Sequence, residues 1–162
     1  MLACNLLFKS LGQALQHLDD NQLAPPLFLL LSKLALVMFE PSDLSLRLVP
    51  LLCGLISVWL FARLVWRLVP GWFAVISTVV FSLHFEYLEY STTFKQYACD
   101  HLITILLLLA ATRWAKIEAR LRGILAALLP LSIGLSLTSV FGLFGLWVVS
   151  LVEAIRVRGK RQ

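Results

Sequence analysis

The polar run YLEYSTTFKQYACDH, residues 87–101, stands between apolar stretches that have the composition of membrane helices. It contains two acids, a lysine and three tyrosines. An acidic side chain at membrane depth is costly unless it is paired or faces water, so such residues commonly mark functional sites. The run therefore predicts either a wet surface or the lining of a site, and the apolar sequence on both sides of it decides the fold.

The composition of the whole chain indicates an integral membrane protein. Its 162 residues are 60% hydrophobic and 14% charged, and their mean hydropathy is +0.88. Soluble domains are nearer one half apolar and about one quarter charged. We expect an all-α fold, a polytopic transmembrane bundle of about four to six membrane helices. Residues 1–162 are expected to form one integral-membrane unit with an interfacial N-terminal region.

Apolar runs predict helices at 27–39, 44–64, 72–83 and 97–112, after an amphipathic interfacial helix at 1–18. Pro25 and Pro26 open the run at 27–39, because proline is tolerated at the first helical position. That run is shorter than the about 20 residues of a full span, so it is either a short tilted span or an interfacial helix. The apolar region 124–152 is either one long span or two short helices broken near residues 136–139.

Basic clusters predict the topology. Cytoplasmic loops are enriched in Lys and Arg, so residues 65–71, 113–122 and 156–162 are expected on the cytoplasmic side of the cell (inner) membrane. Residues 19–26 and 84–96 then lie on the outer face, and the break in 124–152 is favoured because it keeps the last two clusters on one side. A nucleic-acid patch is the alternative for the last cluster, but its apolar surroundings point to membrane lipids as partners and against nucleic acid.

Within the polar run, Gln96, Asp100 and Thr104 are four residues apart and line one helix face. Asp100 is a candidate site residue, and Tyr97 lies beside it. The alternative is structural: Asp100 caps the helix or pairs with Lys95 at a wet interface. Lys95 itself either extends to lipid headgroups or holds a phosphate as a point charge.

Other polar residues carry weaker predictions. Cys4, Cys53 and Cys99 are far apart and lack ligand spacing, so neither a metal nor a disulfide is expected, and the last two are interpreted as small apolar residues. His84 and His101 are interpreted as interfacial. Residues 19–26 form a second polar segment, and the alternative interpretation of it is a solvated loop that caps the next helix.

Three motifs resemble those of a known family. They are N-Q-x-A-P-P at residues 21–26, L-R-L-V-P-L-L-C-G-L at 46–55 and Y-S-x-x-x-K-Q-Y-x-x-D at 90–100, with weaker similarity over 136–151. In this order and spacing they are similar to bacterial membrane glycosyltransferases of the C-type fold (GT-C). These are family 39-like proteins, related to protein O-mannosyltransferases and lipid A aminoarabinose transferases.

The resemblance implies an activity and a set of substrate-binding residues. Such enzymes transfer a sugar from a polyprenyl-phosphate donor, at the outer face, to a lipid, glycan or protein, and they need a carboxylate base. The implied binding residues are Gln22, Tyr90, Lys95, Gln96, Tyr97 and Asp100. Gln22 and Lys95 would contact phosphate or sugar, the two tyrosines would form a wall for the sugar ring, and Asp100 would position a polar neighbour or the acceptor.

The chain departs from the family at both ends. In the family, an Asp-Glu pair upstream of N-Q-x-A-P-P supplies the catalytic acid, and further spans follow the last basic cluster. The resemblance therefore implies a fragment that is inactive alone, with its catalytic residues expected upstream of Met1. A lipid-linked sugar is the implied substrate, and no cofactor or metal is predicted. The alternatives are a non-catalytic membrane protein, either lipid-binding or an accessory subunit, and, less favoured, a transporter.

Overall fold

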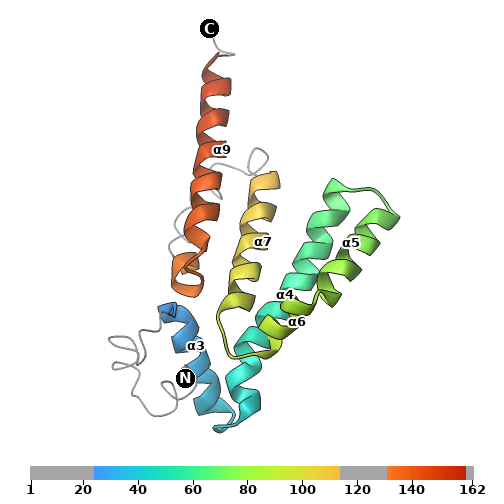
Figure 1. Ribbon diagram of the computed structural model, residues 1–162. Helices are drawn as coiled ribbons and strands as arrows, with labels where there is room; N and C mark the ends of the chain where they lie inside the picture. Colours follow the sequence, from blue (N-terminus) through green and yellow to red (C-terminus); the bar gives the residue numbers. More distant parts are fainter. Residues whose placement is uncertain (1–23, 114–130, 160–162) are drawn as a thin grey trace.

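The computed structural model describes residues 24–113 and 131–159, and every regular element in these ranges is helical (Figure 1). The helices are α3 (Pro26–Met38), α4 (Asp43–Leu68), α5 (Trp72–Leu83), α6 (Phe85–Thr92), α7 (Tyr97–Arg113) and α9 (Ser139–Gly159). Residues 131–135, which precede α9, are also helical. The all-α class is therefore confirmed for the described residues. The predicted interfacial helix at 1–18 and the basic segment 114–122 lie outside them.

A tight turn joins α3 to α4. Pro26 opens α3 as predicted, and Glu40 takes a positive φ of 61° after the helix ends. Ser42 then caps α4: its hydroxyl accepts a hydrogen bond from the Ser45 amide at 3.2 Å, and the Ser45 hydroxyl accepts one from the Ser42 amide at 2.9 Å. This reciprocal pair is a capping box, which fixes the first turn of a helix. The turn sends α4 back alongside α3.

Helix α4 is the central element. It contacts α3, α5, α6 and α7, and α7 in turn contacts α6 and α9. The main core cluster lies where α3, α4 and α7 meet, and its members are Phe28, Leu29, Leu36, Leu46, Cys53, Leu60, Ala98, Cys99, Leu102 and Ile105. The polar run 87–101 therefore leads directly into the core, because its last residues form the first turns of α7.

The predicted helix limits are close to the observed ones, with two corrections. Helix α4 continues to Leu68, so the connection predicted at 65–71 is shorter; Val69 is extended because it precedes a proline, and Gly71 takes a positive φ of 55°. The run 84–96 contains the eight-residue helix α6. A helix break near 136–139 is confirmed, because residues 136–138 separate the helical residues 131–135 from α9.

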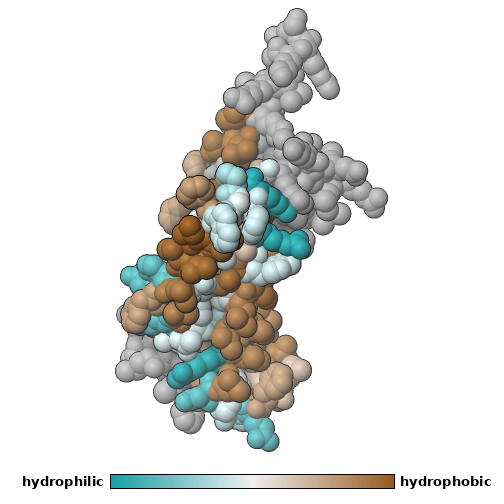
Figure 2. Space-filling view, turned by 90° about the vertical axis from the view of Figure 1, so that its right-hand side faces the viewer, coloured by the Kyte–Doolittle hydropathy of each residue, from teal (hydrophilic) through white to brown (hydrophobic). Residues whose placement is uncertain are grey.

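The described residues contain one helix, α4, that is long and apolar enough to cross a membrane by itself. Helices α6 and α7 meet the same criterion together, as a pair bent by 115°. Helices α3 and α5 and residues 139–152 are apolar but shorter than a span. Large apolar side chains are nevertheless exposed, among them Trp72, Phe85 and Phe141, and Figure 2 shows hydrophobic residues over much of one face. The four to six membrane helices stay a prediction.

Candidate ligand site at the bend between α6 and α7

The two helices of the bent pair are separated by residues 93–96. Two threonine hydroxyls bond to backbone carbonyls just before the break. Thr92 Oγ1 donates to the Leu88 carbonyl at 2.9 Å, and Thr93 Oγ1 donates to the Glu89 carbonyl at 2.8 Å. Such local bonds compete with continuation of the helix. Thr93 is extended, and the Lys95 amide donates to the Thr93 carbonyl at 2.9 Å, which closes a small turn. The break thus begins at two threonines whose side chains bond to carbonyls of the preceding turn.

Helix α6 is fixed against α4 at a glycine. The Tyr87 hydroxyl donates a hydrogen bond to the Gly54 carbonyl, and the Ser91 hydroxyl donates to the Tyr87 carbonyl at 2.8 Å. A Cβ atom at position 54 would lie 2.5 Å from Ser91 Oγ and 2.8 Å from its Cβ. Only glycine permits this approach, because real Cβ contacts are longer. The start of the bend therefore has a fixed position relative to α4.

Aromatic rings from both helices gather at the bend. The Tyr90 ring lies 4.8 Å from the Tyr97 ring and 6.2 Å from the His101 ring, measured between centroids. Tyr87 meets His101 edge-on at 5.5 Å. The Lys95 ammonium lies 5.6 Å from the centre of the Tyr97 ring. Three predicted site residues, Tyr90, Lys95 and Tyr97, are therefore brought together.

Asp100 lies in the first turn of α7, where a carboxylate complements the positive end of the helix dipole. Its amide donates to the Gln96 carbonyl at 3.1 Å. Its Oδ1 atom is buried without a hydrogen-bond partner among the described residues. The structure describes both Asp100 and Lys95 and contains no ion pair between them, so the predicted alternative of such a pair is wrong here. An unpaired buried oxygen is costly, and because this one is buried, a ligand does not reach it in the observed arrangement of side chains.

The remaining predicted residues have different outcomes. Gln96 precedes α7 and is half-buried, and its carbonyl accepts the amides of Cys99 and Asp100. Thr104 is exposed one turn beyond Asp100. Gln22 lies outside the described residues, and the segment 19–26 is described only from Ala24 onward.

The predicted catalytic pair has no counterpart in the described structure. The resemblance places that pair upstream of Met1, and Met1 itself lies outside the described residues, which begin at Ala24. The location of the catalytic acid therefore stays a prediction.

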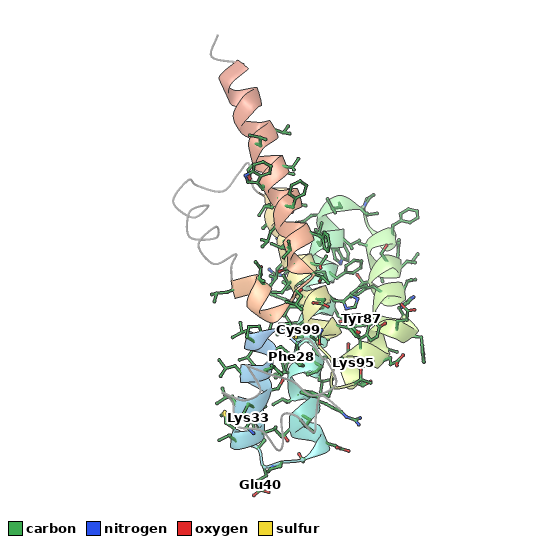
Figure 3. All side chains as sticks on the ribbon, turned by 60° about the vertical axis from the view of Figure 1, so that its left-hand side comes forward. Phe28, Lys33, Glu40, Tyr87, Lys95 and Cys99 are labelled. Carbon is green, nitrogen blue, oxygen red and sulfur yellow. The ribbon has the colours of Figure 1, made fainter. Side chains whose placement is uncertain are left out.

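The described end of the segment 19–26 does approach the bend. Phe28, in the first turn of α3, stacks on Phe94 with ring centroids 5.4 Å apart. Figure 3 shows Phe28 beside Cys99 where the helices meet, with Lys95 and Tyr87 at the bend. We call the side chains of Tyr90, Lys95, Tyr97, Asp100 and His101 the bend site. It has aromatic walls, one cation and one unsatisfied carboxylate oxygen.

Sequence reasoning missed two features of this region. His101 belongs to the aromatic cluster, and its Nδ1 lies 2.9 Å from the Tyr97 carbonyl; the four-residue spacing of the two side chains was the available signal. The Cys53 and Cys99 sulfurs lie 3.2 Å apart, and no local pattern reveals which helices face one another. No group of three or more His, Cys, Asp or Glu side chains in the described part of the chain is placed to hold a metal ion.

Comparisons with known proteins add no relative. No protein-family model matches the chain, and no curated protein and no solved structure matches it either. The resemblance to GT-C glycosyltransferases therefore stays a hypothesis that rests on the three sequence motifs, and the chemistry of the bend site has to be argued from its own residues.

Proposed function

We propose that this chain is a multi-pass membrane protein whose bend site binds the phosphate and sugar of a polyprenyl-phosphate sugar, as the donor side of a GT-C-like glycosyltransferase. One observation carries the proposal: the side chains of Tyr90, Lys95 and Tyr97 come together at the break of an apolar helix pair, and Asp100 lies in the first helical turn after it. No catalytic role is assigned to any of them.

The break itself supports a binding role. Irregular backbone at membrane depth leaves amide groups unsatisfied, so it is tolerated only where protein covers it or where it lines a wet cavity. Broken membrane helices accordingly form substrate sites in transporters, where their ends face charged groups. The α6–α7 break combines an exposed Lys95 with the first amides of α7. A phosphate suits the Lys95 ammonium, whereas the Asp100 carboxylate already complements the positive end of α7 and would repel a second anion there.

The rest of the site suits a sugar attached to that phosphate. The tilted rings of Tyr90 and Tyr97 offer an apolar wall, and pockets for small ligands combine such walls with a few placed polar groups. Phosphate and ring would then be recognised by two different kinds of chemical group in one short segment.

The membrane placement is part of the proposal. The basic residues Arg63 and Arg67 favour a cytoplasmic position for the 65–71 connection. The bend, at the other end of α5 and α6, would then face outward, with α3, α5 and α9 as shorter membrane-embedded helices of a bundle of about four to six.

Photolabelling tests the binding role. Membrane vesicles that contain the full chain are titrated with a photoreactive polyprenyl-phosphate hexose. Lys95→Ala should weaken labelling about tenfold or more, since a charge-assisted hydrogen bond contributes about 1.5–3 kcal/mol. Arg67→Ala also removes one positive charge, but at the C-terminal end of α4 instead of at the bend, and it should leave labelling unchanged. Equal labelling of wild type and Lys95→Ala would contradict the proposal.

A non-catalytic accessory subunit is the second candidate. The exposed aromatic side chains of α5 and α9, such as Trp72, Phe73, Phe141 and Trp147, would suit packing against partner helices within the membrane. Absence of donor labelling, together with co-purification of a defined membrane partner from mild detergent, would favour it over the donor-binding role.

A further inference from the structure

The centre of the core contains a pair of thiols from two different helices. Cys53 lies in the middle of α4 and Cys99 in the first turn of α7, 46 positions later in the chain. Their sulfur atoms are 3.2 Å apart, within hydrogen-bond distance for sulfur. Both cysteines are free and buried, with 7% of Cys53 and none of Cys99 exposed.

The surrounding contacts hold this pair in register. Cys53 and Cys99 belong to one core cluster with Phe28 of α3, and Gly54, the residue after Cys53, receives the Tyr87 hydroxyl of α6. The α4–α7 interface therefore cannot slide at this level without breaking contacts to two further helices. A disulfide needs an S–S distance of about 2.05 Å, so the sulfurs have to approach by only about 1.2 Å.

We propose that Cys53 and Cys99 form an oxidisable dithiol that closes into an intramolecular disulfide between α4 and α7. Each thiol loses one hydrogen, one S–S bond forms, and two electrons and two protons pass to the oxidant. The oxidant is a membrane-permeant two-electron acceptor of the quinone or diazene class, which becomes the hydroquinone or the hydrazine. Of the two cysteines, Cys53 is the one that keeps an exposed fraction, 7% of the residue, whereas Cys99 keeps none.

The disulfide would fix the first turn of α7 to the middle of α4. Cys99 directly precedes Asp100 and lies two residues after Tyr97. Oxidation therefore restrains the α7 side of the bend, as the Tyr87–Gly54 contact restrains the α6 side. This inference concerns the helix pair alone and holds whether or not the bend binds a lipid-linked sugar.

Thiol counting tests the proposal. A Cys4→Ser chain keeps Cys53 and Cys99 as its only thiols. Vesicles that contain it are treated with diamide, an oxidant of the diazene class. The protein is then denatured and labelled with a maleimide polymer that adds a fixed mass for each free thiol. The untreated monomer should carry two labels, and the oxidised monomer none. Dithiothreitol should restore both labels.

Controls separate an intramolecular bond from other outcomes. A chain with Cys4→Ser and Cys53→Ser, and one with Cys4→Ser and Cys99→Ser, should each keep one label on the monomer after the same treatment. Oxidation of glutathione trapped in the vesicles shows that the oxidant has entered. The proposal would be overturned if the Cys4→Ser monomer kept two labels although the trapped glutathione had been oxidised. It would also be overturned if the treatment gave disulfide-linked dimers in place of the unlabelled monomer. The main measurement uses the intact pair, so it does not depend on the folding of the chains in which Cys53 or Cys99 is replaced.

Discussion

At the residue scale, Gly54 determines how closely α6 approaches α4. Its missing side chain leaves room for Ser91, and its carbonyl accepts the Tyr87 hydroxyl. The sequence places Gly54 inside a membrane-like helix, where glycine is common, and so gives no sign of this role. The close contact becomes visible only when α6, absent from the sequence prediction, is seen against α4.

Gly54→Ala should therefore destabilise the protein. The new Cβ would overlap Ser91, and overpacking of a filled interface costs about 1–3 kcal/mol. Gly145→Ala is the matched control, because a Cβ there meets no atom within 4 Å and alanine is the better helix former. Thermal unfolding in detergent should show a lower midpoint for the first variant and an equal or higher midpoint for the second. Equal midpoints for both variants would show that the α4–α6 approach is looser than described.

At the element scale, the helix limits could be predicted where the sequence contains proline or glycine residues that begin or end a helix. Pro26 opens α3, and Pro70 with Gly71 separates α4 from α5, because these residues restrict or free the backbone whatever surrounds them. Helix α6 was missed because its polar composition is also that of a loop. It is stabilised by tertiary contacts, such as that of Tyr87 with Gly54.

In the candidate site too, local features could be predicted from the sequence and contacts between distant helices could not. The approach of Tyr90, Lys95 and Tyr97 could be predicted from their nearness in sequence, whereas the proximity of Cys53 to Cys99 depends on which helices pack together. Hydrophobic periodicity identifies the buried face of a helix and leaves its partner unspecified.

The capping box at the start of α4 allows a second test of how much a local interaction stabilises a helix. Ser42→Ala removes the hydroxyl that accepts the Ser45 amide, and loss of such a cap costs about 1 kcal/mol. Ser150→Ala is the control: that hydroxyl donates to the Leu146 carbonyl at 2.8 Å, within the interior of α9, where such bonds add little. Denaturation in a urea series should show the loss for Ser42→Ala alone. Identical curves for the two variants would mean that the capping box does not stabilise α4.

At the scale of the whole molecule, helix lengths relate the bend to the membrane. Helix α4 has 26 residues, about 39 Å of helix, which exceeds a hydrocarbon core of about 30 Å. Helices α5 and α6 have 12 and 8 residues, together about 30 Å, and Figure 1 shows α6 continuing the descent of α5 before α7 turns back. Because Ser91, near the end of α6, lies against Gly54 in the middle of α4, the α5–α6 pair returns alongside the second half of α4, and in the proposed topology it would lead back toward the outer face.

The resulting topology can be tested by thiol accessibility. In a chain with Cys4, Cys53 and Cys99 replaced by alanine, Thr92→Cys marks the exposed end of α6, and Arg67→Cys marks the exposed end of α4. A membrane-impermeant maleimide added to intact cells should label Thr92→Cys and spare Arg67→Cys, which should react only after permeabilisation. The reason is that Arg67 lies shortly before the start of α5 and Thr92 at the end of α6, and the proposed topology places the basic end in the cytoplasm. Labelling of both positions from the same side would mean that this pair does not cross, and the bend site could not then face outward while Arg67 faces inward.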